Sequence, residues 1–203
     1  MRVNRKSFWS AKKMFVAMLL TGAAVSVAVY HEEIRDSFVD HNKYHKQIVR
    51  TAAKYGVDSR LIKALIFRES RFDPNARGRF GEIGLMQIIP ASAVEDWARY
   101  HGVKSPDPGL LYSPSLNIEI GTWYLAKAIT RWRMYKHGIE LALCQYNAGE
   151  SRAVKWKPKS YNDPMLDNIT IKSTRSYVET IMKKYNQLCK TNTLNKGSNN
   201  DKK

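Results

Sequence analysis

Disulfides, metal sites and β-structure find little support in this sequence. It contains two cysteines, Cys144 and Cys189, and five histidines. Two cysteines are too few for a disulfide framework, and neither they nor the scattered histidines show the spacing of metal ligands. There is no internal repeat and no run of alternating apolar and polar residues, the pattern typical of strands. We therefore expect a helical protein without a metal or another cofactor.

Acidic residues are also scarce. Asp and Glu number 18 against 34 Lys and Arg, which gives a formal net charge of +16. Such a surface favours polyanions, and the charge alone does not distinguish nucleic acid, anionic lipid and an acidic cell-wall polymer. No nucleic-acid-binding motif accompanies the basic residues. We therefore do not expect nucleic acid as a partner.

Long apolar runs are rare, and the one that stands out covers residues 14–30. It carries no charge and follows a basic stretch, which is the order of a targeting segment. Ser26, Val27 and Ala28 suit cleavage of a signal peptide, whereas a length of 17 residues is near the lower limit for a signal anchor. Both alternatives predict export to the periplasmic or extracytoplasmic face of a bacterial inner membrane. The membrane-bound anchor is the preferred alternative.

From residue 43 onward the apolar residues recur at helical spacing. Spacing, caps and breakers predict helices over residues 43–55, 59–72, 90–102, 115–135, 139–146 and 174–188. Asp58 or Ser59 is expected to cap the second of these and Asp73-Pro74-Asn75 to stop it, while Gly149 is expected to cap the end of the fifth. Residues 104–114 and 151–171 are expected to be connectors. The fold class is thus all-α, or α+β at most with a short hairpin at residues 78–84. We divide the chain into a targeting segment (1–30), a connector (31–42), a catalytic domain (43–190) and a disordered polar tail (191–203).

One carboxylate lies in an unusual place in this pattern. Leu61, Leu65 and Glu69 are spaced at i, i+4 and i+8, so they share one face of a helix. Burial at the edge of this apolar face and the negative helix C-terminus both oppose ionisation, so we expect a raised pKa for Glu69. A raised pKa suits a general acid at neutral pH. On spacing alone, the alternative is a solvated Glu at a fraying helix end.

Four sequence blocks occur in an order that matches a known family. They are Glu69-Ser70 with Phe72, Pro74, Asn75 and Ala76; Gly81 with Gly84-Leu85-Met86-Gln87-Ile88 and Pro90; Asn117-Ile118-Glu119-Ile120-Gly121 with Tyr124-Leu125; and Tyr146-Asn147-Ala148-Gly149. Residues 50–185 resemble the catalytic domain of lytic transglycosylases of the soluble (Slt) type, which have a lysozyme-like fold of the goose type. This resemblance favours a functional interpretation of Glu69.

The resemblance implies cleavage of the β-1,4 bond between N-acetylmuramic acid and N-acetylglucosamine in peptidoglycan, with a 1,6-anhydromuramoyl product. Glu69 would be the sole acid and base. Two alternatives remain: a lysozyme-type muramidase that uses water, and a noncatalytic wall-binding assembly module. A secretion or conjugation apparatus is a candidate partner besides the glycan strands and the membrane.

The resemblance also implies roles for other residues. Ser70, Met86, Gln87, Tyr146, Asn147 and Tyr177 are expected at the substrate site. Gln87 would bond sugar groups or, alternatively, its own loop; Met86 would form an apolar wall or, alternatively, part of the core. Tyr177 would direct its hydroxyl at Glu69.

Several positions depart from the family pattern, among them Gln145 and Ser173-Thr174-Arg175, and two lie in the loop after Glu69. Gly78 replaces a usual Ser nine residues after the Glu, and Glu82 replaces a usual Ala. We expect Glu82 to bond loop amides or Arg79. Separately, Cys144 lies in an apolar helical pattern and is expected to be a buried thiol, with a disulfide to Cys189 as the alternative in an exported protein.

Overall fold

The computed structural model describes residues 39–197 together with four single positions nearer the N-terminus, Met14, Met18, Val27 and Ile34. The described residues from His41 onward form one compact unit. Most of the targeting segment and most of the connector therefore lie outside the described residues. None of the helices that the structure describes is long and apolar enough to cross a membrane.

The described chain is helical, as predicted. Its α-helices are α2 (His45–Tyr55), α3 (Ser59–Ser70), α4 (Glu95–His101), α5 (Pro114–Trp132), α6 (Gly138–Ala148), α7 (Glu150–Trp156) and α8 (Lys172–Gly197). A π-helical turn (Pro90–Val94) precedes α4, and short 3-10 turns span Pro108–Tyr112 and Leu166–Asn168. The described part contains no extended strand, only isolated antiparallel bridges from Ile83 to Arg77 and Ile88. The expected hairpin is reduced to these bridges, and the all-α class is confirmed.

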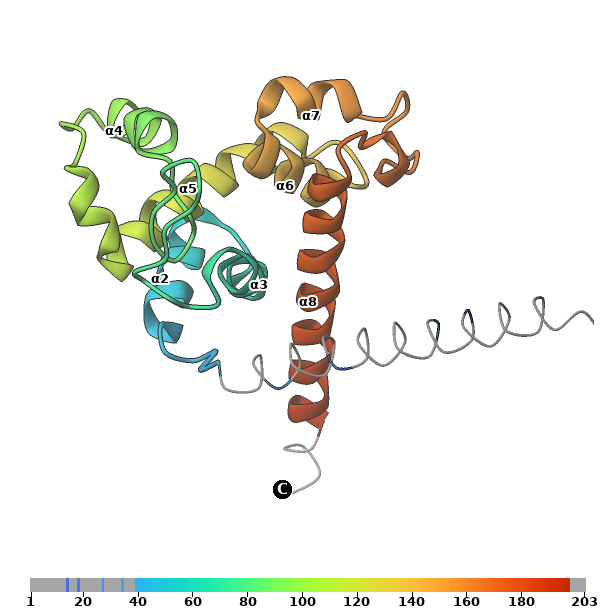
Figure 1. Ribbon diagram of the computed structural model, residues 1–203, viewed down its shortest axis with the longest axis horizontal. Coiled ribbons are helices and arrows are strands. Elements are labelled where there is room, and N and C mark those ends of the chain that lie inside the picture. Colours follow the sequence, from blue (N-terminus) through green and yellow to red (C-terminus); the bar gives the residue numbers. More distant parts are fainter. Residues whose placement is uncertain (1–13, 15–17, 19–26, 28–33, 35–38, 198–203) are drawn as a thin grey trace, which may run out of the picture. The chain divides into compact units, whose positions relative to one another are not determined.

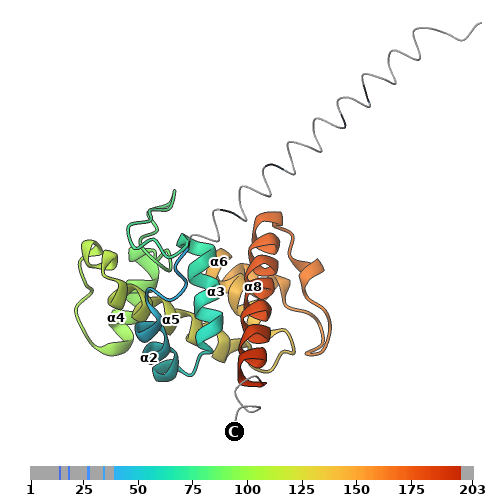
Figure 2. The same cartoon turned by 90° about the horizontal axis from the view of Figure 1, so that it is seen from below.

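The core lies where α3 and α5 meet their neighbours. Helix α5 packs against α2 and α6, while α3 packs against α2 and α8. Figures 1 and 2 both show α3 beside α8. The face of α3 predicted from the sequence is buried: Leu61, Ile62, Leu65 and Ile66 are at most 1% exposed. Each such side chain contributes about 1.5–3 kcal/mol when buried, which fixes α3 rigidly and with it the Glu69 backbone.

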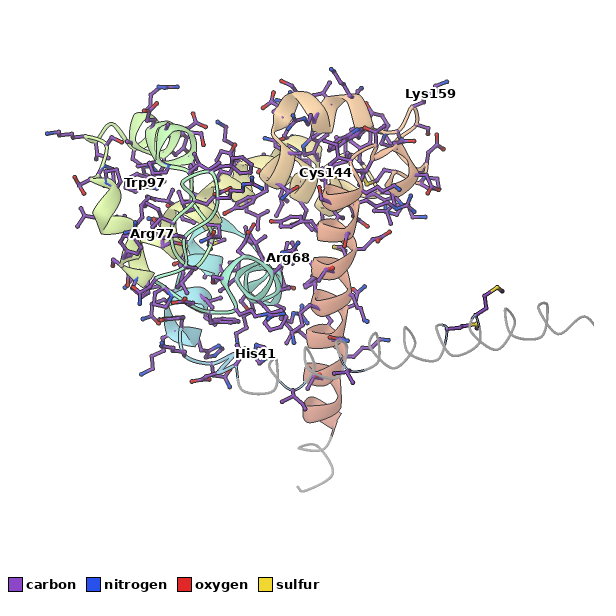
Figure 3. The ribbon with its side chains drawn as sticks, viewed as in Figure 1. His41, Arg68, Arg77, Trp97, Cys144 and Lys159 are labelled. Carbon is purple, nitrogen blue, oxygen red and sulfur yellow. The ribbon has the colours of Figure 1, made fainter. Side chains whose placement is uncertain are left out.

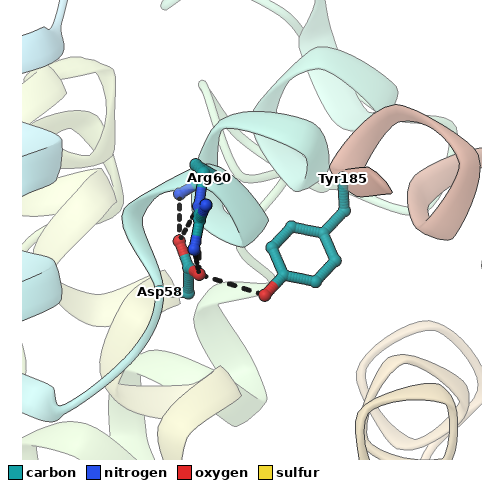
Figure 4. Close-up of polar contacts among 3 residues, drawn as sticks. All are labelled: Asp58, Arg60 and Tyr185. Carbon is teal, nitrogen blue, oxygen red and sulfur yellow. Dashed lines mark hydrogen bonds and ion pairs between the residues drawn. The ribbon is translucent and has the colours of Figure 1, made fainter. Parts of the chain in front are cut away.

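The N-terminus of α3 is tied to α8 by a polar contact (Figure 4). Asp58 caps α3, because its side chain accepts a hydrogen bond of 2.8 Å from the Arg60 amide. Arg60 also forms an ion pair with the same carboxylate, and Tyr185 of α8 donates to Asp58 Oδ2 at 3.0 Å. These bonds keep the pKa of Asp58 below its usual value, the Arg60 side chain being the main cause. The contact aligns α3 and α8 along their length.

Helix boundaries differ from the predictions at three places. Residues Glu150–Trp156 form α7, although most of them were expected in a connector. Only Ala153 and Trp156 of this helix are buried, and two positions are too few to reveal a period. Helix α8 runs on to Gly197, since no Gly or Pro interrupts it earlier. Residues 191–197, expected in the disordered tail, are therefore helical, and the rest of that tail lies outside the described residues.

The third difference is the end of α3. We expected the helix to stop at Asp73-Pro74, but it ends at Ser70, directly after Glu69. Arg71 and Phe72 both have positive φ angles, 51° and 65°. This backbone is unfavourable for side-chain-bearing residues and persists only where the surroundings impose it. Phe72 is buried, so core packing fixes the sharp turn that follows Glu69.

Cys144 and Cys189 form no disulfide. Cys144 lies in α6 (Figure 3) and is fully buried, as the apolar pattern predicted. Burial raises the pKa of its thiol to about 12, so it is not a reactive nucleophile. The disulfide alternative is therefore wrong for this structure.

Candidate active site

Glu69 and Tyr177 meet between two helices. Glu69 occupies the last turn of α3, and the Tyr177 hydroxyl of α8 donates a hydrogen bond of 2.5 Å to Glu69 Oε1. Tyr177 is 2% exposed, and the Arg68 guanidinium lies 5.3 Å from its ring centroid. Because the phenol is fixed from both sides, it fixes the orientation of the carboxyl group. The structure thus brings together two residues 108 positions apart in the sequence.

The environment of Glu69 raises its pKa from 4.5 to about 7. Burial is the largest cause, because desolvation disfavours the charged form. The hydrogen bond from Tyr177 and the positive charge of Arg68 act in the opposite direction, while the like charge of Glu82 raises the pKa further. A carboxyl group with this pKa exchanges a proton near neutral pH, as a general acid and base must.

The loop from Gly84 to Ile88 runs alongside this pair, and it does not expose the side chains that the sequence suggested. Met86 is 0% exposed, and a Cβ on Gly121 of α5 would lie 2.6 Å from its sulfur. The expected apolar wall for a sugar is therefore wrong for this side chain, which packs in the core. Gln87 has a positive φ of 48°, and its Nε2 donates to the carbonyls of Gly84 (2.9 Å) and Ala76 (3.2 Å). The side-chain nitrogen of Gln87 therefore stabilises the loop itself, as the alternative interpretation predicted. Glu82 likewise bonds a loop amide, as expected, since its Oε2 accepts a hydrogen bond of 2.7 Å from the Phe80 amide.

Two other predicted site residues support the same loop through their hydroxyls. Ser70 Oγ donates to the Leu85 carbonyl at 2.8 Å, and Tyr146 donates to the Met86 carbonyl at 2.9 Å. Tyr146 extends from α6 and meets Tyr124 edge-on, with ring centroids 5.6 Å apart. Burial, the main cause, and the nearby Glu69 raise the pKa of Tyr146 well above its usual value. Tyr146 is thus a neutral neighbour of Glu69.

Asn147 is placed apart from the loop, at the C-terminal end of α6. Its side chain is exposed, and its Oδ1 accepts a hydrogen bond of 2.8 Å from the Thr174 hydroxyl in the first turn of α8. Within the described part of the chain its Nδ2 donates to no other group. This nitrogen is available for a ligand acceptor.

Asn117 carries more of the site than the sequence suggested. It is 0% exposed in α5, its Oδ1 accepts from the Met86 amide, and its Nδ2 donates to the carbonyls of Ile83 and Leu111, all at 2.8 Å. Sequence reasoning placed Asn117 in a matching block but gave it no role. The signal that could have identified it is a polar residue at a core-facing position of the predicted helix 115–135, because a buried polar group needs hydrogen-bond partners.

The candidate site does not coincide with the hollow on the surface of α4 and α5. A hollow of about 500 Å³ lies over α4 and α5, with Tyr55, Tyr100, Trp123 and Lys127 in its lining. None of the predicted site residues lines it. Across the described residues, no group of three or more His, Cys, Asp or Glu side chains is arranged to bind a metal ion.

Among the described residues, the chain is an all-helical domain whose desolvated Glu69 carboxyl group accepts a hydrogen bond from the buried Tyr177, which makes Glu69 the candidate general acid. Residues 46–169 match the family described as the transglycosylase SLT domain. The match covers more than half of the chain, so the chain belongs to this family.

Relatives and solved structures agree with this assignment. The membrane-bound lytic murein transglycosylase E of Buchnera aphidicola subsp. Acyrthosiphon pisum is 35% identical over 147 residues, which are 70% of this chain and 66% of that protein. The membrane-bound lytic murein transglycosylase C of Actinobacillus pleuropneumoniae serotype 5b is 36% identical over 108 residues, which are 53% of this chain and 28% of that protein. The chain therefore spans only part of each relative.

Two solved structures share the fold. An inactive mutant of the lytic transglycosylase Slt from Pseudomonas aeruginosa has a TM-score of 0.64 and 27% identity, covering 73% of this chain and 25% of that one. The 70 kDa soluble lytic transglycosylase of Escherichia coli has a TM-score of 0.63 and 26% identity, covering 71% and 23%. The predicted lysozyme-like, transglycosylase-type fold is confirmed.

Proposed function

We propose that this protein is a peptidoglycan lytic transglycosylase. The observation that carries the proposal is the Glu69 carboxyl group, which has a pKa of about 7 and accepts a 2.5 Å hydrogen bond from Tyr177. Membership of the transglycosylase SLT domain family supports the same conclusion. The names of its relatives, murein transglycosylases, support peptidoglycan as the substrate class.

Glu69 serves as both acid and base in the proposed reaction. Protonated Glu69 donates to the glycosidic oxygen, and the bond from that oxygen to C1 of N-acetylmuramic acid breaks. The Glu69 carboxylate then takes the proton of the C6 hydroxyl, whose oxygen bonds to C1 and closes the 1,6-anhydro ring. Glu69 loses one proton and regains one, so it ends the reaction protonated, and no water is consumed. One group with a pKa near neutrality suits both steps, because each protonation state is accessible.

The neighbouring residues are proposed to position the sugars. The free Nδ2 of Asn147 would donate to an acetamide carbonyl or a hydroxyl, and Tyr146 would offer the edge of its ring. Gln87 Nε2 donates to the loop carbonyls, and Gln87 Oε1, which accepts no hydrogen bond from the described residues, would accept one from a sugar donor. Ser70 contributes indirectly, since its hydroxyl bonds the Leu85 carbonyl.

Product analysis tests this function against the hydrolase alternative. Purified protein incubated with peptidoglycan is expected to release muropeptides with 1,6-anhydro ends, which are lighter by one water than reducing ends and are separated by mass spectrometry. Reducing ends alone would identify a lysozyme-type hydrolase. Release of neither product would favour the noncatalytic assembly module.

The proposed location is the extracytoplasmic side of a bacterial membrane. The apolar residues 14–30 behind a basic flank support export, and the relatives are named as membrane-bound. We expect the full chain in the membrane fraction at its unprocessed mass, as seen by immunoblotting of fractionated cells. A shorter soluble form in the periplasm would identify a cleaved signal peptide. A secretion or conjugation apparatus that crosses the cell wall would need peptidoglycan to be cleaved on this side of the membrane. We therefore keep such an apparatus as a proposed partner.

A further inference from the structure

The hollow over α4 and α5 has an aromatic floor and an exposed aromatic edge. The ring centroids of Tyr100 in α4 and Trp123 in α5 are 5.4 Å apart, and the ring planes are inclined by 46°. Trp123 is 6% exposed and Tyr100 is 73% exposed, so Trp123 lies at the bottom while Tyr100 presents its ring to solvent. The His101 ring meets Tyr100 edge-on, with centroids 5.0 Å apart, and supports it from the same helix. An aromatic ring held at the edge of a concave surface suits the apolar face of a ligand.

Charged and hydroxyl groups surround this aromatic floor. Lys127 forms an ion pair with Asp96, and Arg99 Nη1 lies 3.8 Å from the same carboxylate. Lys127 Nζ is also 5.5 Å from the centroid of the Trp123 ring, so the ion pair lies directly at the floor. Thr130 adds an exposed hydroxyl. The hollow thus offers hydrogen-bond donors and acceptors of nearly balanced charge around an aromatic surface.

This combination fits a sugar better than a phosphate group or an acyl chain. A pyranose ring has a face of C–H groups that packs on an aromatic ring, and its hydroxyl groups both donate and accept hydrogen bonds. A phosphate group would meet the Asp96 carboxylate, and an acyl chain would desolvate Asp96, Arg99 and Lys127 without replacing their contacts with water. The volume of about 500 Å³ lies within the usual range for a site that binds a small ligand.

Aromatic rings connect the hollow with Glu69. Trp123 and its neighbour Tyr124 have ring centroids 6.4 Å apart, and those of Tyr124 and Tyr146 of α6 are 5.6 Å apart. Tyr146 in turn is close enough to Glu69 for that carboxylate to add to the effect of burial, the larger cause, in raising the pKa of Tyr146. Tyr124 and Tyr146 are both partly exposed. A polymer bound at Glu69 can therefore reach the hollow along α5, which lies beside α4 (Figures 1 and 2).

We propose that the hollow is a second carbohydrate site, which binds an N-acetylated sugar of the glycan strand at a distance from the bond that Glu69 cleaves. This inference rests on the proposed function. The sugar ring packs on Tyr100, and its hydroxyl and acetamide groups bond Asp96, Arg99 and Thr130. Because one strand then occupies both sites, binding at the hollow raises the effective concentration of the strand at Glu69. The hollow therefore increases the affinity for long strands and leaves the chemical step unchanged.

Binding is measured separately from cleavage. A β-1,4-linked tetramer of N-acetylglucosamine is titrated into 15N-labelled protein, and the amide resonances of α4 and α5 are followed by NMR. We expect shifts at the hollow in the wild type and in Glu69→Gln. Tyr100→Ala, which removes the exposed ring, and Ala126→Leu, which fills the hollow, should each abolish them. Tyr161→Ala, at an exposed tyrosine outside the hollow, is the matched control and should keep them.

Kinetics show whether the hollow contributes to the reaction. With soluble, uncrosslinked glycan strands, Tyr100→Ala and Ala126→Leu should each raise KM about tenfold, the effect of losing one aromatic contact of about 1.4 kcal/mol. The kcat should change by less than about twofold, because neither side chain touches the reacting atoms. The shortest fragment that the wild type cleaves should show no change, since it does not extend to the hollow. An equal rise in KM for both substrates would overturn the role of the hollow in binding long strands.

The outcomes separate this inference from the proposed function. Shifts confined to the surroundings of Glu69, or an unchanged KM for long strands in both variants, would overturn the hollow as a sugar site and leave the transglycosylase reaction intact. A hollow that responds to phosphatidylglycerol vesicles and not to the saccharide would overturn it as well. If the wild type forms no anhydro product while the saccharide still shifts the hollow, the proposed catalytic function fails and the sugar site stands.

Discussion

Glu69→Gln is expected to reduce the formation of 1,6-anhydro products by about 10³-fold, since general acid–base catalysis by one positioned group contributes about 10²–10⁴-fold. Glutamine has no ionisable proton, so it can neither protonate the glycosidic oxygen nor accept the proton of the C6 hydroxyl. Both steps fail together because one residue performs both. Chromatography and mass spectrometry of digested peptidoglycan measure the loss.

The same variant should keep its fold. Glutamine has the size of Glu69, and its Oε1 can accept the hydrogen bond from Tyr177 that Glu69 accepts in the structure. Desolvation of the ionisable Glu69 side chain destabilises the native protein. The melting temperature of Glu69→Gln should therefore equal or exceed that of the wild type. Glu95→Gln serves as the matched control, with full activity expected. More than a tenth of wild-type activity in Glu69→Gln would rule out Glu69 as the sole acid and base.

The long helices were predictable because their buried faces repeat. Helices α3 and α5 bury residues at helical spacing over three or more turns. Asp58 begins α3 and Gly149 ends α6, as the sequence predicted. Helix α7 was missed because its buried face consists of Ala153 and Trp156. The sharp end of α3 was also missed, since the positive φ of Arg71 and Phe72 follows from tertiary packing and not from local preference.

The site was predictable in its chemistry and less so in its geometry. The contact between Tyr177 and Glu69 came from the family resemblance, because no spacing rule joins residues on helices α3 and α8. Met86 and Gln87 belong to a recognisable block, but their directions depend on the backbone, and the positive φ of Gln87 turns its side chain back into the loop. Sequence identifies such a block more readily than it tells which side chains face the substrate.

Asn117 shows what fixes this loop. Three hydrogen bonds of 2.8 Å join its buried amide to the backbone of Ile83, Met86 and Leu111. Gly84 makes the approach feasible, since its φ is 76° and a Cβ there would lie 2.4 Å from Asn117 Nδ2. One side chain of α5 thus satisfies the Met86 amide and shares the Ile83 carbonyl with the Ile88 amide, while Ser70 and Tyr146 bond the carbonyls of Leu85 and Met86.

Asn117→Ala should therefore have the largest effect on stability. It leaves the Met86 amide and the Leu111 carbonyl without their partner and the Ile83 carbonyl with the Ile88 amide alone. Each unsatisfied buried group costs about 1–3 kcal/mol. We expect the free energy of unfolding to fall by at least about 3 kcal/mol, and the melting temperature by about 10 °C for a chain of this size. Calorimetry and urea titration measure both quantities.

Asn117→Asp sharpens the test, because aspartate keeps the acceptor for the Met86 amide but loses both donors and places a charge at a 0% exposed position. If the loop depended on the Met86 bond alone, Asp would restore stability; we expect it to be no better than Ala, because the carbonyls of Ile83 and Leu111 would face a carboxylate. Asn186→Ala, at an exposed position of α8, is the control and should change stability by less than about 0.5 kcal/mol. A wild-type melting temperature for Asn117→Ala would mean that Ser70 and Tyr146, which bond the same loop from α3 and α6, suffice to position it beside Glu69.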